Sequence, residues 1–188
     1  MGKTEQGNDV TLTLDSDVQT AAEAALNGRK GACVVVNSST GAVMGCASAP
    51  TYDENEIEKL LSNPSEDSSA MYNRATQALY APGSTFKIVS LSTALAENAA
   101  KEDDVFSSPS VLDIGGGQVT NYQKTAYGNI TLSRATEVSS NTVYAQIGEK
   151  LGSDKLVAGS EKFQFNKKIN FDIPLAKALM PDPDEMTL

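Results

Sequence analysis

The 188-residue sequence contains no histidine and only two cysteines. Without histidine, a Ser-His-Asp catalytic triad is excluded. Two cysteines without histidine also cannot form an ordinary structural zinc site, and we expect neither a bound metal nor a cofactor. A serine enzyme of this composition therefore needs a base other than histidine.

Long hydrophobic runs are also missing. No apolar run reaches the roughly 18 residues that a membrane-spanning helix requires, and residues 1–8 lack the apolar core of a signal peptide. We expect any export signal or membrane anchor to lie outside this chain. Basic residues are few, with 15 Lys and Arg against 24 Asp and Glu and a net charge of −9. Because the lysines are scattered along the sequence, we expect no nucleic-acid-binding groove.

The residues that are present indicate one globular domain with a hydrophobic core. The sequence is 40% hydrophobic and 21% charged, and we take residues 1–188 as one partial domain. Ser16 to Gln19 fits a helix-capping box, and the apolar spacing after it predicts a helix up to Gly28. Residues 32–37 and 42–47 predict an antiparallel hairpin.

The predicted hairpin places Cys33 opposite Cys46. This pair is compatible with a disulfide bond if the domain is extracytoplasmic. It is equally compatible with two small buried thiols that pack side by side. The sequence leaves both interpretations open.

The second half of the chain is predicted to be mostly helical. Residues 84–96 are apolar on nearly every side, which predicts a buried helix with Ser84 in its first turn. Helical patterns recur at residues 132–138, at 142–151 with a stop at Gly152, and at 154–163.

Ser84 and Lys87 are three residues apart and would share one helix face, as in a Ser-x-x-Lys motif. A lysine can deprotonate a serine only where burial lowers its pKa, and we expect Phe86, Ile88 and Val89 to supply that burial. The backbone amide of Ser84 would lie at a helix N-terminus, where it could help to hold an oxyanion.

The motif gains weight from a second motif and its context. Ser139-Ser140-Asn141 lies between two predicted helices, where a simple helix N-cap is the alternative interpretation. In this order, the two motifs resemble those of the transpeptidase domain of class B penicillin-binding proteins. The resemblance extends to Leu12-Thr13-Leu14-Asp15, Gly31 to Pro50, Asn73-Arg74-Ala75, Tyr80 to Ile88, and Tyr127 to Leu132.

The resemblance implies a peptidoglycan D,D-transpeptidase that acts on D-Ala-D-Ala stem peptides and is acylated by β-lactam antibiotics. By position it implies Ser84 as the acylated nucleophile and Lys87 as its proton acceptor. It further implies Ser139 as a proton shuttle and Asn141 as an amide that orients the substrate. The implied location is the extracytoplasmic face of a bacterial membrane, in an anchored protein associated with other cell-wall synthesis proteins.

The sequence departs from the family pattern after Asn141, because no Lys-Thr-Gly or Lys-Ser-Gly follows. In the family this third motif lies on a strand of the central sheet and completes the oxyanion hole. We therefore expect a partial α/β (α+β) domain of the transpeptidase and β-lactamase type. It would contain an N-terminal antiparallel hairpin of the central sheet and a mostly helical subdomain. The open sheet edge would be able to pair with another chain, and turnover would be weak or absent.

Other classes of function remain open at this point. A β-lactam sensor or binding domain would use the same acylated serine to produce a signal. A β-lactamase would need a base that activates water, and Glu137 and Glu149 are expected to be solvated helix residues instead. A structural role, in which this portion only holds partners, is the fourth interpretation.

Overall fold

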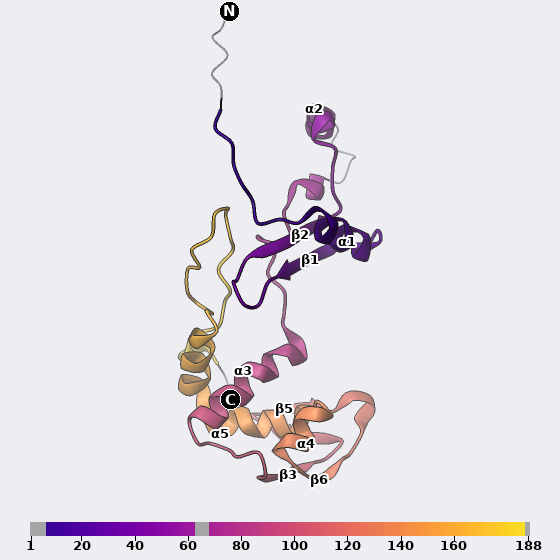
Figure 1. The fold of residues 1–188 in the computed structure, drawn as a ribbon. Helices are drawn as coiled ribbons and strands as arrows, with labels where there is room; N and C mark the ends of the chain where they lie inside the picture. The colour runs from indigo at the N-terminus through magenta and orange to yellow at the C-terminus, as the bar shows by residue number, and fades with distance from the viewer. Residues whose placement is uncertain (1–6, 63–67, 187–188) are drawn as a thin grey trace, which may run out of the picture. The chain divides into compact units, whose positions relative to one another are not determined.

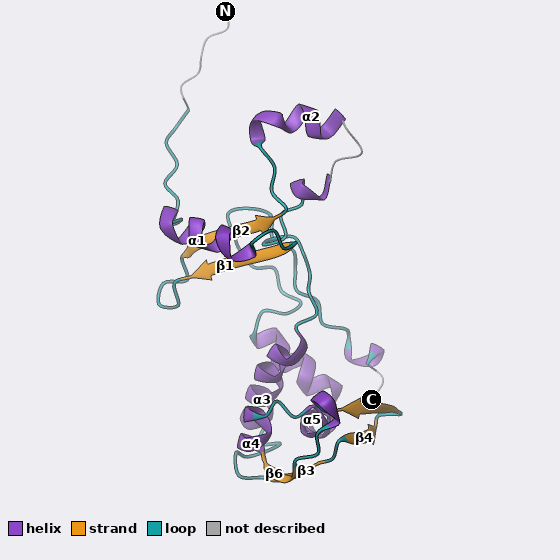
Figure 2. Ribbon diagram, turned by 90° about the vertical axis from the view of Figure 1, so that its right-hand side faces the viewer, coloured by secondary structure: helices purple, strands orange, loops and turns teal. Residues whose placement is uncertain are grey.

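The computed structural model describes residues 7–62 and 68–186, and its contacts divide the chain into two compact units. The first unit is Met1–Ala78 with Ile173–Ala176, and the second is Leu79–Asp172 with Lys177–Leu188. Figures 1 and 2 show the helices and strands of each unit. Of the first eight residues, for which no signal-peptide core is expected, the first six lie outside the described residues.

The first unit is built from helix α1 (Ser16–Leu26) and a hairpin of strands β1 (Gly31–Val36) and β2 (Val43–Ala49). The N-cap of α1 is Asp15, whose carboxylate accepts hydrogen bonds from the backbone amides of Asp17 (3.0 Å) and Val18 (3.1 Å). The predicted capping box at Ser16 was therefore wrong by one residue. An aspartate is an equally good N-cap, and here it precedes the serine.

The hairpin confirms the predicted strands but not the predicted pairing of the two cysteines. Val36 faces Val43, whereas Val35 faces Gly45, so Met44 is an extra residue in β2 that forms a β-bulge. Beyond the bulge, Cys33 pairs with Ala47, and Cys46 pairs with Val34. Because neighbouring pairs point to opposite faces of a sheet, the two thiols lie on opposite faces, and both are free.

The rest of the first unit comprises a 3₁₀ turn η1 (Glu54–Glu56), helix α2 (Ile57–Ser62) and a second 3₁₀ turn η2 (Ser68–Met71). Arg74 is buried and ties this region together. Its guanidinium donates to the carbonyl of Ser69 (2.8 Å), and its backbone amide donates to the Ser48 hydroxyl on β2 (2.9 Å). A buried arginine is tolerated here because its donors meet polar partners.

The second unit contains a 3₁₀ turn η3 (Gly83–Phe86) and helices α3 (Lys87–Ala96), α4 (Leu132–Glu137) and α5 (Asn141–Lys162). Its core packs α3 and α4 against α5, and Figure 1 shows these helices side by side. Gly159 of α5 faces Thr93 of α3 so closely that a Cβ atom at Gly159 would lie 2.9 Å from Thr93 Cβ. It would lie closer still to the Thr93 Oγ1 and Cγ2 atoms. A glycine is required for this approach of the two helices. The core residues are Ala94, Ala100, Phe106, Leu132, Ala135, Val143, Ile147 and Leu151.

The predicted helices of the second unit are confirmed in position, with two corrections. Gly152 breaks α5 as predicted, since its backbone is non-helical (φ 73°, ψ 165°). The segment from Ser84 begins as a 3₁₀ turn and becomes α-helical only at Lys87. It is also not buried on nearly every side, because Ile88 is 62% exposed.

The second half is less helical than predicted, because it contains four short strands. Strand β3 (Val105–Ser108) pairs with β6 (Gly128–Thr131), and β4 (Val111–Ile114) pairs with β5 (Gly117–Thr120). Both pairs are antiparallel, and Figure 2 shows strands of both pairs. Each strand has four residues, which is too short for a clear alternation of apolar and polar side chains.

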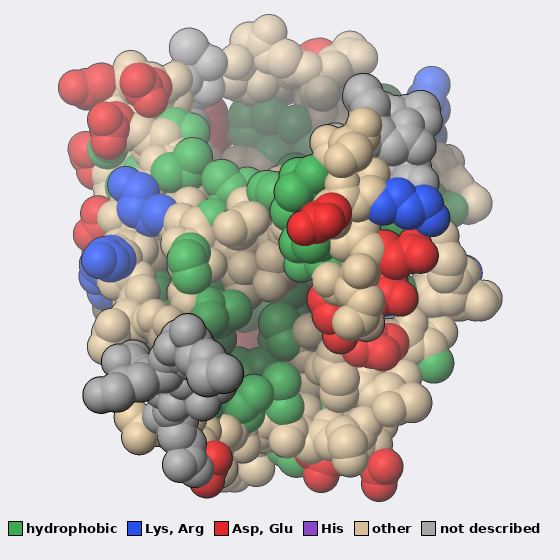
Figure 3. Space-filling model, turned by 90° about the horizontal axis from the view of Figure 1, so that it is seen from above, with side chains coloured by type: hydrophobic (Ala, Val, Ile, Leu, Met, Phe, Trp, Pro, Cys, Tyr) green, Lys and Arg blue, Asp and Glu red, His purple; other side chains and the backbone are tan. Residues whose placement is uncertain are grey.

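Charged, polar and apolar side chains all reach the surface. On the face that Figure 3 presents, basic side chains lie scattered among acidic and apolar ones. Among residues 7–62 and 68–186, no helix combines the length and apolar character of a membrane span.

Candidate active site

Ser84 lies in the exposed 3₁₀ turn η3, one turn before Lys87 begins α3. The Lys87 Nζ atom is 3.3 Å from the Ser84 Oγ atom. Gly83 precedes the serine with a positive φ of 57°, a conformation that favours glycine and lets the chain enter the turn. The predicted contact of the Ser-x-x-Lys pair is thus present in the structure.

Ser139 meets the same lysine from the connection between α4 and α5. The Lys87 Nζ atom donates to the Ser139 carbonyl oxygen (2.7 Å) and lies 2.9 Å from its Oγ. Ser139 has a left-handed backbone (φ 54°), which is uncommon for a residue with a side chain. Ser140 takes the N-cap of α5, where its hydroxyl accepts from the amide of Val143 (3.2 Å). The N-cap interpretation of the motif therefore holds for Ser140, while Ser139 contacts the lysine.

Asn141, the first residue of α5, completes the cluster. Its Oδ1 atom accepts from Lys87 Nζ at 2.6 Å. Its Nδ2 atom donates to the Thr120 carbonyl at the end of β5 (2.8 Å). Because a carbonyl can only accept, this second bond turns the nitrogen of the side-chain amide toward Thr120 and its oxygen toward Lys87.

Lys87 is partly withdrawn from water, and this desolvation lowers its pKa. Of the three residues expected to cover it, Ile88 is exposed, whereas Val89 is buried and Phe86 is half-buried. Lys87 is contacted by Ser139 and Asn141, and its Nζ atom lies 5.4 Å from the centre of the Tyr144 ring. Apart from Ser84, the groups that contact the Lys87 amine therefore come from α5 and the residues before it.

The hydrogen-bonding inventory of this cluster permits proton transfer. The Ser139 carbonyl and the Asn141 Oδ1 can only accept, so they occupy two hydrogens of the Lys87 amine. A neutral amine has two hydrogens and one lone pair, which leaves the lone pair for a hydroxyl. The hydroxyls of Ser84 and Ser139 can each donate or accept. A proton can therefore move from Ser84 to Lys87 and then to or from Ser139.

The sequence did not predict the contacts of three residues that neighbour the cluster. They are Thr120, which holds the amide of Asn141, Asn121, which bonds to the first turn of α5, and Tyr144, whose ring faces Lys87. Thr120 acts through its backbone carbonyl, which any residue possesses. The contacts of Asn121 depend on chain segments that lie apart in sequence.

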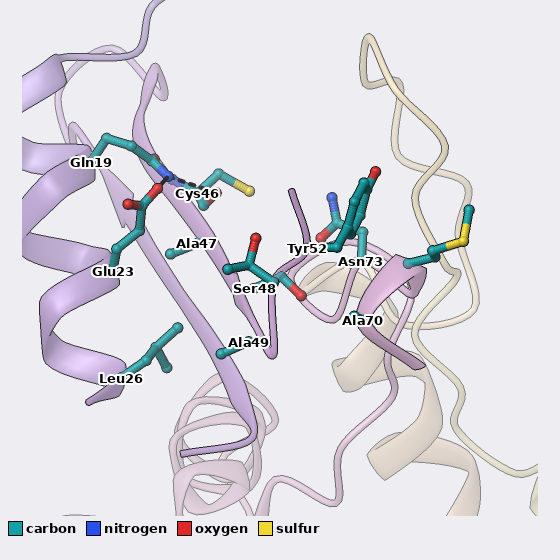
Figure 4. Close-up of a pocket in the computed structure, with 12 residues that line it drawn as sticks. Gln19, Glu23, Leu26, Cys46, Ala47, Ser48, Ala49, Tyr52, Ala70 and Asn73 are labelled. Atoms are coloured by element: carbon teal, nitrogen blue, oxygen red, sulfur yellow. Dashed lines mark hydrogen bonds between the residues drawn. The ribbon is translucent and has the colours of Figure 1, made fainter. Parts of the chain in front are cut away.

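A separate pocket of about 340 Å³ lies within the first unit, between α1, β2 and the segments that follow β2. Figure 4 shows Gln19 of α1 bonded to Cys46 of β2 at one wall, where the Gln19 side chain accepts from the Cys46 amide at 2.7 Å. Tyr52 and Asn73 lie at the opposite wall. None of the four predicted site residues lines this pocket.

Comparison with known proteins places the cluster in a family context. Residues 31–186 match the family model described as the penicillin-binding protein transpeptidase domain. The peptidoglycan D,D-transpeptidase MrdA of Acinetobacter baumannii is 27% identical over 188 residues, which cover 95% of this chain and 28% of the relative. The chain thus spans less than a third of that protein.

Solved structures of similar proteins share the fold. The D,D-transpeptidase domain of a peptidoglycan glycosyltransferase from Eggerthella lenta is 53% identical, with a TM-score of 0.88 over 95% of this chain and 43% of that one. Penicillin-binding protein A from Mycobacterium tuberculosis, as an imipenem acyl-enzyme complex, is 25% identical, with a TM-score of 0.84 over 93% of this chain and 44% of that one. The mixed α and β architecture predicted from the sequence is confirmed by these neighbours.

Proposed function

Because the chain belongs to the family of penicillin-binding protein transpeptidase domains, we propose that it is part of a peptidoglycan D,D-transpeptidase whose nucleophile is Ser84. The matched region, residues 31–186, runs through both compact units. This supports our proposal that the two units belong to one partial domain. The proposed substrates are D-Ala-D-Ala stem peptides, and the proposed inhibitors are β-lactams.

The single observation that carries the proposal is the position of the Lys87 amine. Its Nζ atom is 3.3 Å from Ser84 Oγ, 2.9 Å from Ser139 Oγ and 2.6 Å from Asn141 Oδ1. One base is therefore in contact with the proposed nucleophile, the proposed shuttle and the proposed substrate-orienting amide. A solvated surface lysine would not be held by Ser84 on its own segment and by Ser139 and Asn141 on a second, distant segment.

The proposed reaction begins when Lys87, as the neutral amine, takes the Ser84 proton. Ser84 Oγ attacks the carbonyl carbon between the two D-Ala residues and forms a tetrahedral oxyanion. The carbon–nitrogen bond then breaks, and the leaving D-Ala amine receives the proton from Lys87 through the Ser139 hydroxyl. The acyl group remains as an ester on Ser84 until the amine of another stem peptide attacks its carbonyl carbon. The ester C–O bond then breaks, the attacking amine gives up a proton, and Ser84 Oγ takes one up. A β-lactam would follow the first half, with its ring nitrogen as the leaving group.

The surroundings of the proposed whole protein follow from its relatives. The similar protein MrdA is a peptidoglycan D,D-transpeptidase, and peptidoglycan lies outside the cytoplasm. We propose the same location for this chain, as part of a protein anchored to the membrane. Association with other cell-wall synthesis proteins is part of the same proposal.

A β-lactamase function is less well supported, because it requires a base that activates water against the ester. Glu137 is 61% exposed and pairs with Arg134 at 2.7 Å, and Glu149 is exposed. Among the described residues, neither glutamate forms a hydrogen bond or ion pair with the cluster around Lys87. A long-lived penicillin adduct would separate a transpeptidase or sensor from a β-lactamase.

The proposal is tested by intact-mass spectrometry after incubation of the chain with a penicillin, followed by a peptide digest. We expect one adduct, located on Ser84. Ser84→Ala should lose it, because removal of the nucleophile of a serine hydrolase costs on the order of a millionfold in rate. Ser92→Ala, at an exposed serine of α3, is the matched control and should react like the wild type.

Two results would contradict the proposal. An adduct that persists in Ser84→Ala would show that another residue is the nucleophile. A folded wild-type chain that forms no adduct would show that this chain is not itself reactive and would favour a structural role.

A further inference from the structure

Asn121 lies just after β5 and is 3% exposed. Its side chain forms no hydrogen bond with Lys87, Ser84 or Ser139 in the described part of the chain. Its side-chain nitrogen is within bonding distance of the carbonyls of Pro109 (3.0 Å) and Thr125 (3.1 Å). The nitrogen also lies 3.2 Å from the hydroxyl of Ser108 and 3.1 Å from that of Thr142, so every partner within its reach can accept from it. This fixes the amide of Asn121 and directs its oxygen the other way.

The Oδ1 atom of Asn121 points at the first turn of α5. It accepts from the backbone amide of Thr142 (3.1 Å) and from the hydroxyl of Ser140 (3.3 Å). The first amides of a helix have no partner within the helix. Ser140 satisfies the amide of Val143, and Asn121 satisfies that of Thr142 from a different segment of the chain. The start of α5 is thus capped twice.

The groups around this bond are all buried. The hydroxyls of Ser108 and Ser140 are 2.8 Å apart, and Ser108, Ser140 and Thr142 are at most 1% exposed. A buried network of this kind is stable only when each member keeps its partner, because an unpaired polar group away from water is costly. Removal of the Asn121 side chain would therefore disturb the whole start of α5.

The start of α5 carries the residues that hold Lys87. Asn141 is its first residue, and Ser139 lies three residues before Thr142 with a left-handed backbone. A strained conformation persists only where its surroundings determine it. The residue before Asn121 also holds Asn141 in place, because the Thr120 carbonyl accepts a hydrogen bond from Asn141 Nδ2 at 2.8 Å.

We propose that Asn121 is a positioning residue that sets the places of Ser139 and Asn141 against Lys87. The expected effect on acylation rests on the proposed transpeptidase function. The expected effect on the surroundings of Lys87 does not, because it can be measured without any reaction. Since a displacement of about 1 Å in an active site can cost about a hundredfold in rate, loss of this residue should be visible in acylation.

The test compares the full wild-type chain with Asn121→Ala and Ser160→Ala. Ser160 is fully buried and donates to the Val157 carbonyl (2.7 Å), so its variant is a matched loss of a buried polar group away from the cluster. Acylation by a fluorescent penicillin should slow by about ten- to a hundredfold in Asn121→Ala. In Ser160→Ala it should stay within about twofold at a similar loss of melting temperature.

A second readout needs no acylation. Carbon-13 NMR of lysine labelled at Cε, with the Lys87 signal assigned through Lys87→Arg, reports the surroundings of that amine. We expect its chemical shift and titration to change in Asn121→Ala and to match the wild type in Ser160→Ala. If the wild type forms no penicillin adduct, the proposed function fails for this chain, and the NMR comparison alone decides the role of Asn121. An unchanged Lys87 signal in Asn121→Ala, or an equal change in Ser160→Ala, would overturn the positioning role.

Discussion

The close approach of α3 and α5 yields a prediction with a definite magnitude. Gly159→Ala places a methyl group 2.9 Å from Thr93 Cβ and still closer to the Oγ1 and Cγ2 atoms. Rotation of Thr93 can move Oγ1 and Cγ2, but it cannot move Cβ, so the two helices must separate. Overpacking of this kind costs about 1–3 kcal/mol, and we expect a value near the upper end.

The expected loss can be measured as a melting temperature. For a chain of this length, about 3 kcal/mol corresponds to a decrease of roughly 6–12 °C. The sequence has no tryptophan, so far-ultraviolet circular dichroism, which follows α3 and α5, is the suitable signal. Gly148→Ala is the matched control, because nothing lies within 4 Å of its added Cβ in the same helix. It should be neutral or should stabilise by about 0.5–1 kcal/mol.

A second-site change sharpens the test. Thr93→Ala removes Oγ1 and Cγ2 but keeps Cβ, so it should restore only part of the stability of Gly159→Ala. Because Lys87 lies on α3 and Asn141 on α5, separation of the helices should also slow acylation at Ser84. The reasoning is refuted if Gly159→Ala melts like the wild type, or if it loses no more stability than Gly148→Ala.

Two further predictions concern the lysine and the sheet edge. Desolvation lowers the pKa of Lys87, so its neutral amine is populated at a lower pH than that of an exposed lysine. The acylation rate should therefore rise with pH through that lowered pKa and then level off. Lys87→Met should abolish this rise, whereas Lys155→Met, at a half-exposed lysine, should keep the wild-type profile in a stopped-flow assay; a flat wild-type profile would exclude Lys87 as the base. In the described part of the chain β1 has only β2 as a partner, and its Val36 is 50% exposed. We therefore expect Val36→Lys to reduce self-association in sedimentation velocity. Val10→Lys, at an 81% exposed site before α1, should reduce it less, and equal effects would argue against pairing at this edge.

Local sequence patterns predicted those parts of the fold that depend on local interactions. Gly152 was predicted to end a helix and does break α5, because a positive φ at glycine is a property of one residue. The contact between Ser84 and Lys87 follows from the spacing of one helical turn. The meeting of Ser139 and Asn141 with Lys87 followed from the resemblance to a family and not from spacing.

Features that depend on distant segments could not be predicted in this way. The bulge at Met44 changes the register of the hairpin, and no residue pattern in β2 predicts it. The strands β3 to β6 are too short to show a period. The exposure of Ile88 and the contact of Lys87 with Tyr144 of α5 are properties of helix packing. Asn121 belongs to no motif, and its importance depends on Pro109, Thr125 and Thr142 meeting around it.

The bulge at Met44 also determines how the hairpin responds to oxidants. It places the thiols of Cys33 and Cys46 on opposite faces of a two-stranded sheet, so they cannot join within one molecule while the strands keep this register. Burial raises the pKa of the Cys46 thiol, which keeps it protonated and slow to react. The hairpin therefore forms no disulfide of its own in reducing or in oxidising surroundings while it keeps this register, and its fold does not depend on one.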